Sequence, residues 1–221
     1  MRERALFGIF GGTFNPIHVG HLRAAEEVVE ALRLERMIFV PSAQPPHKES
    51  NGWDSMASAA ERLAWTRQAV LGNTRFEVDD LEVKRGGASF TVETLRSLGD
   101  RAAPMRPVFS IGCDAFAEMD SWREPEVIFT LADFAVTTRP PVTQGFLSDW
   151  LPKCVRADVE IAADGLSGRH CGAGTRIHVI EISALDVSAS DIRRRLRDGH
   201  SIRYLVPESV REAVVRSGTY S

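Results

Sequence analysis

The stretch ALFGIFGGTFNPIHVGH occupies residues 5–21 and decides the class of fold. It opens with a short apolar run that leads into a Gly-Gly pair, which is typical of a buried parallel strand followed by a tight loop. From His18 to Leu34, apolar residues recur at helical spacing and glutamates lie on the opposite side. Met37–Val40 predicts a second strand, which ends at a proline. Together these segments predict a β-loop-α-β unit, the right-handed crossover of a parallel sheet.

The rest of the chain continues this alternation of helices and strands. We expect helices at 56–71, 91–98, 124–131, 191–197 and 207–216, and strand character at 76–83, 108–111, 134–136 and 176–182. Residues 141–175 are Gly-rich and show no clear pattern beyond a short helix near 146–151. The alternation predicts an α/β fold, a Rossmann-like doubly wound parallel sheet with C-terminal helices. We expect one domain over residues 1–221, whose helical C-terminal part begins at about residue 183.

The composition is that of an ordinary globular protein. The chain has 221 residues, 43% of them hydrophobic and 26% charged, with a formal net charge of −3. This balance gives no support to a nucleic-acid partner. The three cysteines form no C-x-x-C pair, so we expect reduced thiols rather than a disulfide framework or a zinc site. No stretch suits a signal peptide or reaches the roughly 18 apolar residues of a membrane span, so we expect a cytoplasmic protein without membrane contact.

The loop that begins at Gly11 is a candidate phosphate-binding site. It follows a strand at the edge of the sheet where open α/β folds bind ligands. Gly11 and Gly12 let the backbone approach an anion, and the N–H groups at the start of a helix favour phosphate. His18 and His21 are three residues apart, so they share one helix face and can donate to phosphate oxygens. A glycine-rich turn with two incidental histidines is the alternative, which the combined pattern disfavours. The loop is neither a Walker loop nor a dinucleotide fingerprint.

A second candidate anion site lies near the other end of the chain, at residues 187–193. Ser190 is the predicted N-cap of the helix expected from residue 191, and Ser188 offers another hydroxyl. Arg193 is expected in the first turn, where it could bind phosphate as a bidentate donor. Taken alone, this stretch fits a capped surface helix with solvated arginines equally well.

These two stretches resemble the nucleotidyltransferase superfamily that is marked by a His-x-Gly-His motif, and within it the bacterial nicotinate-nucleotide adenylyltransferase family. Residues 11–21 resemble the family's opening, and residues 187–193 resemble its Ser-x-Ser/Thr-x-Ile-Arg signature. Further similar segments follow in order at 40–48, 88–95, 111–114, 121–122, 138–140 and 205–207. Four positions depart from the pattern, one of which is Ala88, where proline is frequent. Asn15 stands where aspartate is common, Phe90 replaces a frequent tyrosine, and Arg123 follows Trp122 where some relatives carry an aromatic residue.

The resemblance implies a reaction. ATP and nicotinate mononucleotide would give nicotinate adenine dinucleotide and pyrophosphate, a step of NAD synthesis. The acceptor's 5′-phosphate is already an anionic nucleophile, so the protein would supply positioning and charge neutralisation. Mg²⁺ would travel on the ATP phosphates, without protein ligands. The resemblance makes His18, His21 and Arg193 the catalytic residues, with His21 the most critical.

The resemblance also assigns residues to the two substrates. The ATP-binding residues would be Gly11, Gly12, Thr13, Phe14, His18, His21, Ser188, Ser190 and Arg193. The acceptor-binding residues would be His47, Lys48, Thr91, Gly112, Asp114 and Trp122. Three of them have a plainer alternative: an exposed N-cap for Asp114, a core aromatic residue for Trp122, and a solvated loop lysine for Lys48.

Several rival functions share parts of this pattern. Another adenylyltransferase of the superfamily would use nicotinamide mononucleotide or phosphopantetheine as acceptor. A class I aminoacyl-tRNA synthetase has a similar motif, but this chain is too short for an anticodon domain. A non-catalytic nucleotide sensor should have lost a motif histidine or Arg193, and the chain retains them. The expected partners are therefore ATP and nicotinate mononucleotide. A homo-oligomer is compatible with the sequence, which does not define the oligomeric state.

Overall fold

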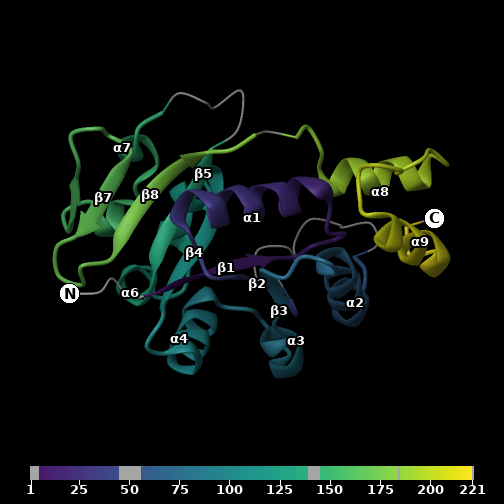
Figure 1. The fold of residues 1–221 in the computed structure, drawn as a ribbon, viewed down its shortest axis with the longest axis horizontal. Coiled ribbons are helices and arrows are strands. Elements are labelled where there is room, and N and C mark those ends of the chain that lie inside the picture. The colour runs from purple at the N-terminus through teal and green to yellow at the C-terminus, as the bar shows by residue number, and fades with distance from the viewer. Residues whose placement is uncertain (1–4, 45–55, 139–144, 184, 221) are drawn as a thin grey trace. The chain divides into compact units, whose positions relative to one another are not determined.

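The computed structural model describes residues 5–44, 56–138, 145–183 and 185–220, which form helices and one eight-stranded sheet (Figure 1). The strands are β1 (Leu6–Gly12), β2 (Met37–Pro41), β3 (Phe76–Val78), β4 (Arg106–Gly112), β5 (Asp133–Thr138), β6 (Val159–Ile161), β7 (Ser167–His170) and β8 (Arg176–Glu181). Their order in the sheet is β3-β2-β1-β4-β5-β8-β7-β6. Its first five strands repeat the 3-2-1-4-5 order of Rossmann-type sheets, so the predicted fold class is confirmed.

The predicted helices lie close to their expected positions, and two short helices, at residues 81–85 and 113–117, were not predicted. The helices are α1 (Val19–Leu32), α2 (Ala59–Val70), α3 (Leu81–Arg85), α4 (Thr91–Ala102), α5 (Cys113–Ala117), α6 (Pro125–Leu131), α7 (Leu147–Trp150), α8 (Ala189–Arg197) and α9 (Glu208–Ser217), with 3-10 turns η1 (Met119–Ser121) and η2 (Lys153–Val155). Helix α2 starts at a capping box, in which Ser58 Oγ accepts from the Glu61 N–H at 3.2 Å and the Ser58 N–H donates to the Glu61 carboxylate at 2.9 Å. Within the described ranges, every helix lacks the length and apolarity that a membrane crossing needs.

The described residues fall into two compact units, each built from separate segments of the chain. The first unit lies within residues 1–10, 26–37 and 90–183, and the second lies within residues 11–25, 38–89 and 184–221. The motif loop, α2, α8 and α9 all belong to the second unit. The single domain expected over residues 1–221 stays a prediction.

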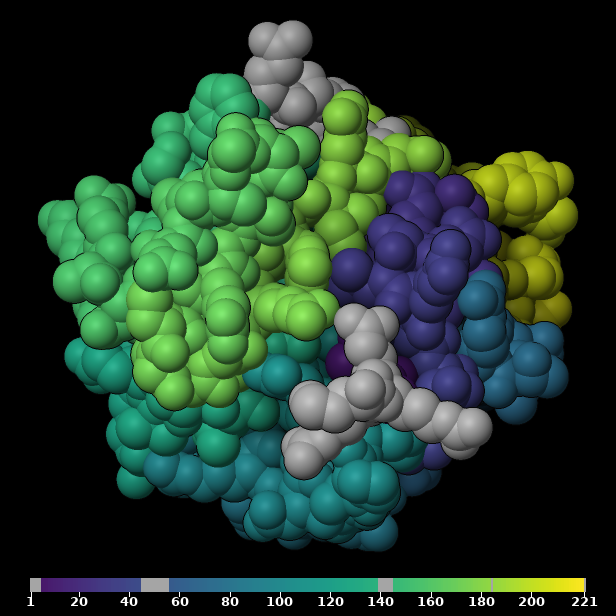
Figure 2. Space-filling model, turned by 60° about the vertical axis from the view of Figure 1, so that its left-hand side comes forward, coloured from purple at the N-terminus to yellow at the C-terminus, as the bar shows by residue number. Residues whose placement is uncertain are grey.

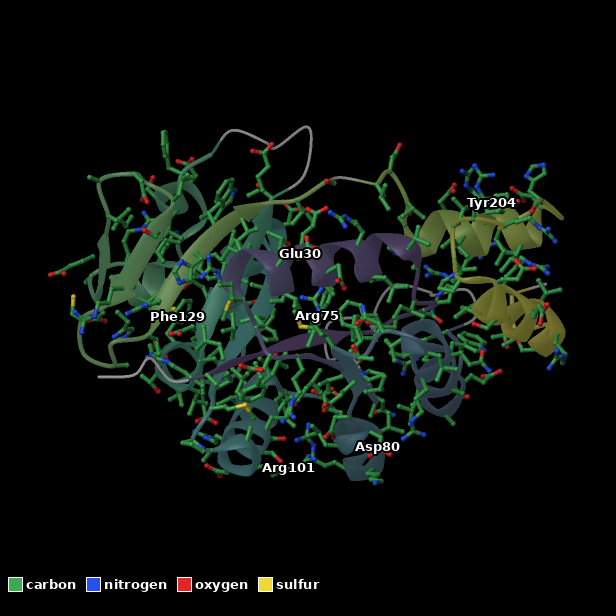
Figure 3. The ribbon with its side chains drawn as sticks, viewed as in Figure 1. Glu30, Arg75, Asp80, Arg101, Phe129 and Tyr204 are labelled. Atoms are coloured by element: carbon green, nitrogen blue, oxygen red, sulfur yellow. The ribbon has the colours of Figure 1, made fainter. Side chains whose placement is uncertain are left out.

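The core of the first unit is built on β5, which pairs in parallel with β4 on one side and β8 on the other. Five of its six residues are buried, as expected for a parallel strand covered on both faces. Two aromatic rings pack against Phe134, which is itself a residue of β5. The ring centroids of Phe129 and Phe134 are 4.6 Å apart, and Phe116 lies 5.7 Å from Phe134; Phe129 is labelled in Figure 3. Through Phe116, this packing holds α5 against β5, and the N-cap of α5 is Gly112, the last residue of β4.

An antiparallel hairpin, β6–β7, extends the sheet beyond β8 within residues 141–175, where the sequence showed no clear strand pattern. Its surface appears in light green in Figure 2. The turn contains Asp164-Gly165, in which Gly165 has φ +70° and Asp164 Oδ1 accepts from the Leu166 N–H at 2.8 Å. Asp-Gly between two short strands is a strong hairpin signal, so the sequence did contain the information.

The strand expected at residues 76–83 is wrong in its second half. Strand β3 ends at Val78, and the helix α3 begins at Leu81. The Leu81 N–H donates to Asp79 Oδ1 at 2.9 Å, so a local turn replaces the sheet ladder. Gly86 ends α3 with φ +69°, a conformation that favours glycine.

Candidate active site

The loop that connects β1 with α1 holds the first predicted motif. Phe14 turns its side chain inward, because it is only 2% exposed and its ring meets His21 edge-on at a centroid distance of 5.2 Å. Gly12 makes room for this ring, since a Cβ at that position would lie 2.8 Å from Phe14 Cε1. The sequence predicted Gly12 as an approach for an anion. The structure adds a packing requirement, and it leaves Phe14 with only its backbone to offer a ligand.

The two motif histidines lie against each other at the start of α1. Their ring centroids are 3.7 Å apart and the ring planes are inclined by 26°. The backbone N–H of His18 donates to His21 Nδ1 at 3.3 Å. A nitrogen that accepts a hydrogen bond carries no proton, so a neutral His21 has its proton on Nε2. The fold thereby makes His21 Nε2 a hydrogen-bond donor, as phosphate binding requires.

The second motif forms the start of α8, but the helix begins two residues earlier than predicted. The N-cap is Ser188 and not Ser190, because Ser188 Oγ accepts from the Asp191 N–H at 3.1 Å and α8 begins at Ala189. Ser190 instead accepts from Arg193 Nη2 at 3.1 Å. Arg193 therefore lies beyond the first turn. The solvated character expected of the neighbouring arginines is confirmed for Arg194, whose side chain is 64% exposed.

The structure brings the two motifs together within the second unit. Arg193 Nη1 donates to the main-chain oxygen of Asn15 at 2.8 Å, across 178 residues of sequence. Gly20 lies at the same junction, since a Cβ there would approach Val187 Cγ1 to 2.9 Å and His18 Nδ1 to 3.1 Å. Arg193 is 7% exposed, and burial lowers its pKa. Its charge is poorly screened by water and can act strongly on an anion.

Sequence reasoning missed Arg62, which holds the motif loop by a hydrogen bond to its backbone. Arg62 of α2 is fully buried, at 0% exposed. Its Nη1 donates to the main-chain oxygen of Thr13 at 2.6 Å, its Nη2 to that of Ala43 at 2.9 Å, and its Nε to that of Ala57 at 3.1 Å. Burial lowers the pKa of Arg62. No sequence motif indicates such a residue, because its partners are backbone carbonyls.

Asn15 is the other buried polar residue of the loop, at 3% exposed. An asparagine in a loop commonly bonds its own local backbone in an Asx turn, as an aspartate would. Oδ1 of Asn15 instead accepts from the Ala57 N–H at 3.1 Å and from the hydroxyl of Tyr220 near the end of the chain. Tyr220 is 2% exposed, and burial raises its pKa.

The predicted acceptor residues that the structure describes belong to the first unit. Thr91 is half-buried at the start of α4, Gly112 is the N-cap of α5, and Asp114 is exposed in the first turn of α5. Trp122 is half-buried, and its ring meets Phe109 edge-on at 6.3 Å, so it is not a fully enclosed core residue. His47 and Lys48 lie outside the described residues.

Two departures from the family pattern contact each other in this unit. The Arg123 guanidinium lies over the Phe90 ring, 4.6 Å from its centroid, and Arg123 Nη1 is 3.2 Å from Glu93 Oε1. A cation over an aromatic face is attracted by the ring's electrons. The contact ties the residue after Trp122 to the residue before Thr91, so these two acceptor candidates are held in the same region.

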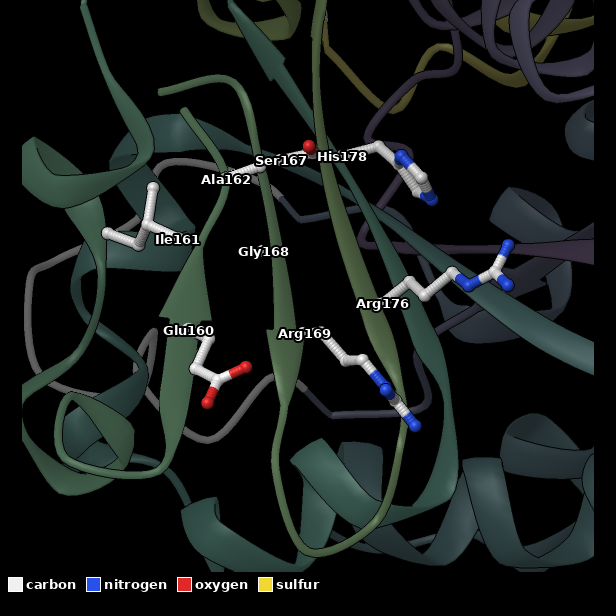
Figure 4. Close-up of a pocket in the computed structure, with 8 residues that line it drawn as sticks. All are labelled: Glu160, Ile161, Ala162, Ser167, Gly168, Arg169, Arg176 and His178. Atoms are coloured by element: carbon white, nitrogen blue, oxygen red, sulfur yellow. The ribbon is translucent and has the colours of Figure 1, made fainter. Parts of the chain in front are cut away.

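A separate groove crosses the sheet face of β6, β7 and β8, with a volume of about 360 Å³ (Figure 4). It is lined by Glu160, Ile161, Ala162, Ser167, Gly168, Arg169, Arg176 and His178. None of the predicted site residues lines it, so it is not the predicted site.

A family described as "Cytidylyltransferase-like" matches residues 9–195 of the chain. Curated relatives cover nearly all of it. A "Probable nicotinate-nucleotide adenylyltransferase" of Desulfatibacillum aliphaticivorans is 41% identical over 220 residues, which cover 96% of this chain and 98% of that protein. One of the same name from Marinobacter nauticus is 42% identical over 219 residues, which cover 96% of this chain and 95% of that protein.

Solved structures show a similar fold. The nicotinic acid mononucleotide adenylyltransferase of Plasmodium falciparum, complexed with NaAD, has a TM-score of 0.71 at 16% identity, covering 98% of this chain and 97% of that one. A putative nicotinate-nucleotide adenylyltransferase from Vibrio parahaemolyticus has a TM-score of 0.59 at 17% identity, covering 98% and 95%. At these identities the likeness concerns the fold alone.

Proposed function

The chain belongs to the nicotinate-nucleotide adenylyltransferases of the cytidylyltransferase-like family, and we propose that it transfers the AMP part of ATP to nicotinate mononucleotide. The observation that carries the assignment of its active site is the meeting of the two motifs in one unit. Arg193 donates to Asn15 of the first motif, which also contains the stacked histidines.

The reaction needs little chemistry from the protein. An oxygen of the acceptor's 5′-phosphate forms a bond to the α-phosphorus of ATP, and the bond from that phosphorus to the bridging oxygen of the β-phosphate breaks. Pyrophosphate leaves with the electron pair. The attacking phosphate is already an anion, so no general base is required. Rate acceleration therefore comes from positioning and from donors that meet the charge as it develops.

We assign these donors to residues of both motifs. His21 donates from Nε2, the nitrogen that its contact with His18 leaves protonated. Arg193 neutralises the β- and γ-phosphates, with a guanidinium already oriented by Asn15 and Ser190. Gly11, Gly12, Thr13 and Phe14 contribute backbone contacts to the nucleotide, and Ser188 a hydroxyl.

In this proposal, Mg²⁺ enters the site bound to the phosphates of ATP. When bound, it shields the negative charge of the phosphates and assists the departure of pyrophosphate. The second motif contains one carboxylate, Asp191, which is already paired with Arg194 and Arg195. The other side chains proposed to contact the phosphates are imidazoles, a guanidinium and hydroxyls, whereas Mg²⁺ prefers carboxylate oxygens. Among the described residues, no cluster of three or more His, Cys, Asp or Glu side chains could hold a metal ion. The phosphate oxygens are therefore its proposed ligands.

For the acceptor, we propose that the indole of Trp122 stacks on the pyridine ring and that Thr91 hydrogen-bonds its carboxylate. Gly112 and Asp114 follow the end of β4, a position suited to contact a ribose or the acceptor. Lys48 and His47 would pair with the acceptor phosphate. We also propose a cytoplasmic location, where ATP is supplied.

Pyrophosphate release by the full chain tests this function. The enzyme is given ATP and Mg²⁺ with nicotinate mononucleotide, nicotinamide mononucleotide or phosphopantetheine in parallel reactions, and the products are identified by mass. We expect the fastest release with nicotinate mononucleotide, and nicotinate adenine dinucleotide as the product. Release only with phosphopantetheine would overturn the acceptor. ATP binding without release in any reaction would instead favour a nucleotide sensor.

A further inference from the structure

A cluster of three buried polar residues, Asn15, Arg62 and Tyr220, lies beneath the motif loop in the second unit. We call it the Arg62 cluster. Their exposed fractions are 3%, 0% and 2%. Burying a polar group is costly unless it is hydrogen-bonded, so the partners of these residues indicate what the cluster is built to hold.

Arg62 holds three separate stretches of backbone with one guanidinium. Its partners are the carbonyls of Thr13 in the motif loop, Ala43 after β2, and Ala57 before α2. Among the described residues, no carboxylate pairs with it. Apolar side chains often stabilise a core better than a buried charge, so the cluster is better explained by the loop geometry that it enforces than by stability alone.

Asn15 links this cluster to the proposed triphosphate site. Its side-chain Oδ1 accepts from Tyr220, and its main-chain oxygen accepts from Arg193. The Ala57 N–H also donates to Oδ1, which fixes the orientation of the amide. Nδ2 of Asn15 is buried without a partner among the described residues. Leaving a buried donor unpaired is a cost, which again favours a role in geometry.

The residues that follow α9 place Tyr220 in this cluster. Gly218 ends α9 with φ +65°, a left-handed conformation that reverses the chain. Thr219 then donates to Glu61 of α2 at 2.9 Å, and the Tyr220 ring lies 5.9 Å from that of Trp65 in α2. Burial raises the pKa of the Tyr220 hydroxyl, and the positive charges of Arg193 and Arg62 oppose that rise.

We propose that Tyr220, the next-to-last residue, is a positioning residue for the triphosphate site, acting through Asn15 on Arg193. The inference rests on the proposed function. The Tyr220 hydroxyl donates to Oδ1 of Asn15, and the main-chain oxygen of Asn15 accepts from Arg193. Arg193 in turn binds the pyrophosphate as it leaves. Loss of the hydroxyl leaves the fold intact but loosens this chain of contacts. Binding of ATP should then weaken, while binding of the acceptor should not.

The test compares Tyr220→Phe with a matched control, Thr219→Val, in the full chain. Both variants remove one buried or partly buried hydroxyl from the same tail, but only the Tyr220 hydroxyl contacts Asn15. We expect Tyr220→Phe to raise the KM for ATP about three- to tenfold, the usual effect of one lost hydrogen bond. The KM for nicotinate mononucleotide should stay unchanged, and Thr219→Val should change neither.

A double-mutant cycle with Arg193→Lys separates positioning from simple stability. If Tyr220 acts through Arg193, its loss should have little further effect once Arg193 is replaced. Three outcomes would overturn the proposal. The first is an equal rise in both KM values together with a loss of Tm, and the second is full additivity in the cycle. The third is an ATP KM of Tyr220→Phe within twofold of the unmutated enzyme. If the unmutated chain releases no pyrophosphate, the proposed function fails; calorimetric ATP affinities of the same variants then decide the role of Tyr220 separately.

Discussion

At the scale of single residues, the two motif histidines are held differently. His18 is 7% exposed, whereas His21 is half-buried and receives the backbone N–H of His18 on Nδ1. The backbone therefore selects which nitrogen of His21 donates, before any substrate binds. A donor that is oriented in advance stabilises a transition state without the cost of reorganisation.

Replacing His21 with alanine should lower kcat on the order of a hundredfold or more, because a preorganised donor to the reacting phosphates is lost. Steady-state kinetics with ATP and nicotinate mononucleotide measure the effect, and circular dichroism checks folding. His200→Ala is a matched control, since His200 is exposed beyond the end of α8. A folded His21→Ala enzyme with nearly normal turnover would remove this residue from the mechanism.

Trp122 should affect the acceptor rather than ATP. Trp122→Ala is expected to raise the KM for nicotinate mononucleotide about tenfold, by loss of a ring-stacking surface, and to leave the KM for ATP unchanged. Trp122→Phe keeps an aromatic face and should recover most of the affinity. Trp150→Ala, at another half-buried tryptophan, controls for general loosening of the first unit. An unchanged acceptor KM in Trp122→Ala would make Trp122 a packing residue only.

Individual site residues could be predicted only where a motif reveals them. His18 and His21 belong to one short motif of unusual spacing, and Arg193 belongs to another. In the structure the histidines stack on each other, and Arg193 donates to the loop that precedes them. Arg62 and Tyr220 carry no such spacing. An arginine inside an ordinary helix pattern is expected at the surface, and Tyr220 reaches its partner across 205 residues. Burial of this kind follows from tertiary packing, which a single sequence does not display.

At the scale of secondary-structure elements, the start of α8 shows how neighbouring polar residues compete. Ser188 and Ser190 are both good N-caps by residue type. The contact of Ser190 with Arg193 decides between them, because it leaves Ser188 to cap the helix. The sequence therefore predicted the helix correctly but its N-cap wrongly. The deciding residue is Arg193, whose position also depends on its hydrogen bond to Asn15, in a loop far away in the sequence.

Ser188→Ala should therefore destabilise the protein, although Ser188 is exposed. Loss of the N-cap hydrogen bond costs about 1 kcal/mol, which corresponds to a fall in Tm of about 2–4 °C in a chain of this length. Thermal unfolding followed by circular dichroism measures the change. Ser188→Thr keeps a capping hydroxyl and should restore most of the Tm. A Tm equal to that of the unmutated protein would show that the cap contributes nothing.

At the scale of the whole molecule, the alternation of helices and strands was sufficient to predict the sheet class. The alternation and the handedness of crossovers restrict the possible strand orders, but they do not choose between the 3-2-1-4-5 order of this sheet and the 2-1-3-4-5 order of other doubly wound sheets. The extension by β6 and β7 does not follow from the alternation either, because these strands have only three and four residues and their apolar pattern is weak. Only the Asp164-Gly165 turn marks them. The addition leaves His178 of β8 half-buried beside charged neighbours.

This environment predicts a specific loss of stability in mild acid. Burial is the main cause that lowers the pKa of His178 below 6.5, and Arg176 adds to it, whereas Asp133 and Asp164 oppose it. Below pH 6.5 the unfolded chain therefore binds a proton that the folded chain resists. The free energy of unfolding is therefore not reduced by His178 above pH 6.5, where the imidazole is neutral in both states. It declines as the pH falls from 6.5 toward the pKa of His178 in the folded protein. The Tm should fall between pH 7.5 and pH 5.5, and His178→Gln should reduce that fall, because the variant has no imidazole to protonate at this position. His200→Gln, at an exposed histidine, should keep the full decline; the same decline in His178→Gln would rule His178 out as its cause.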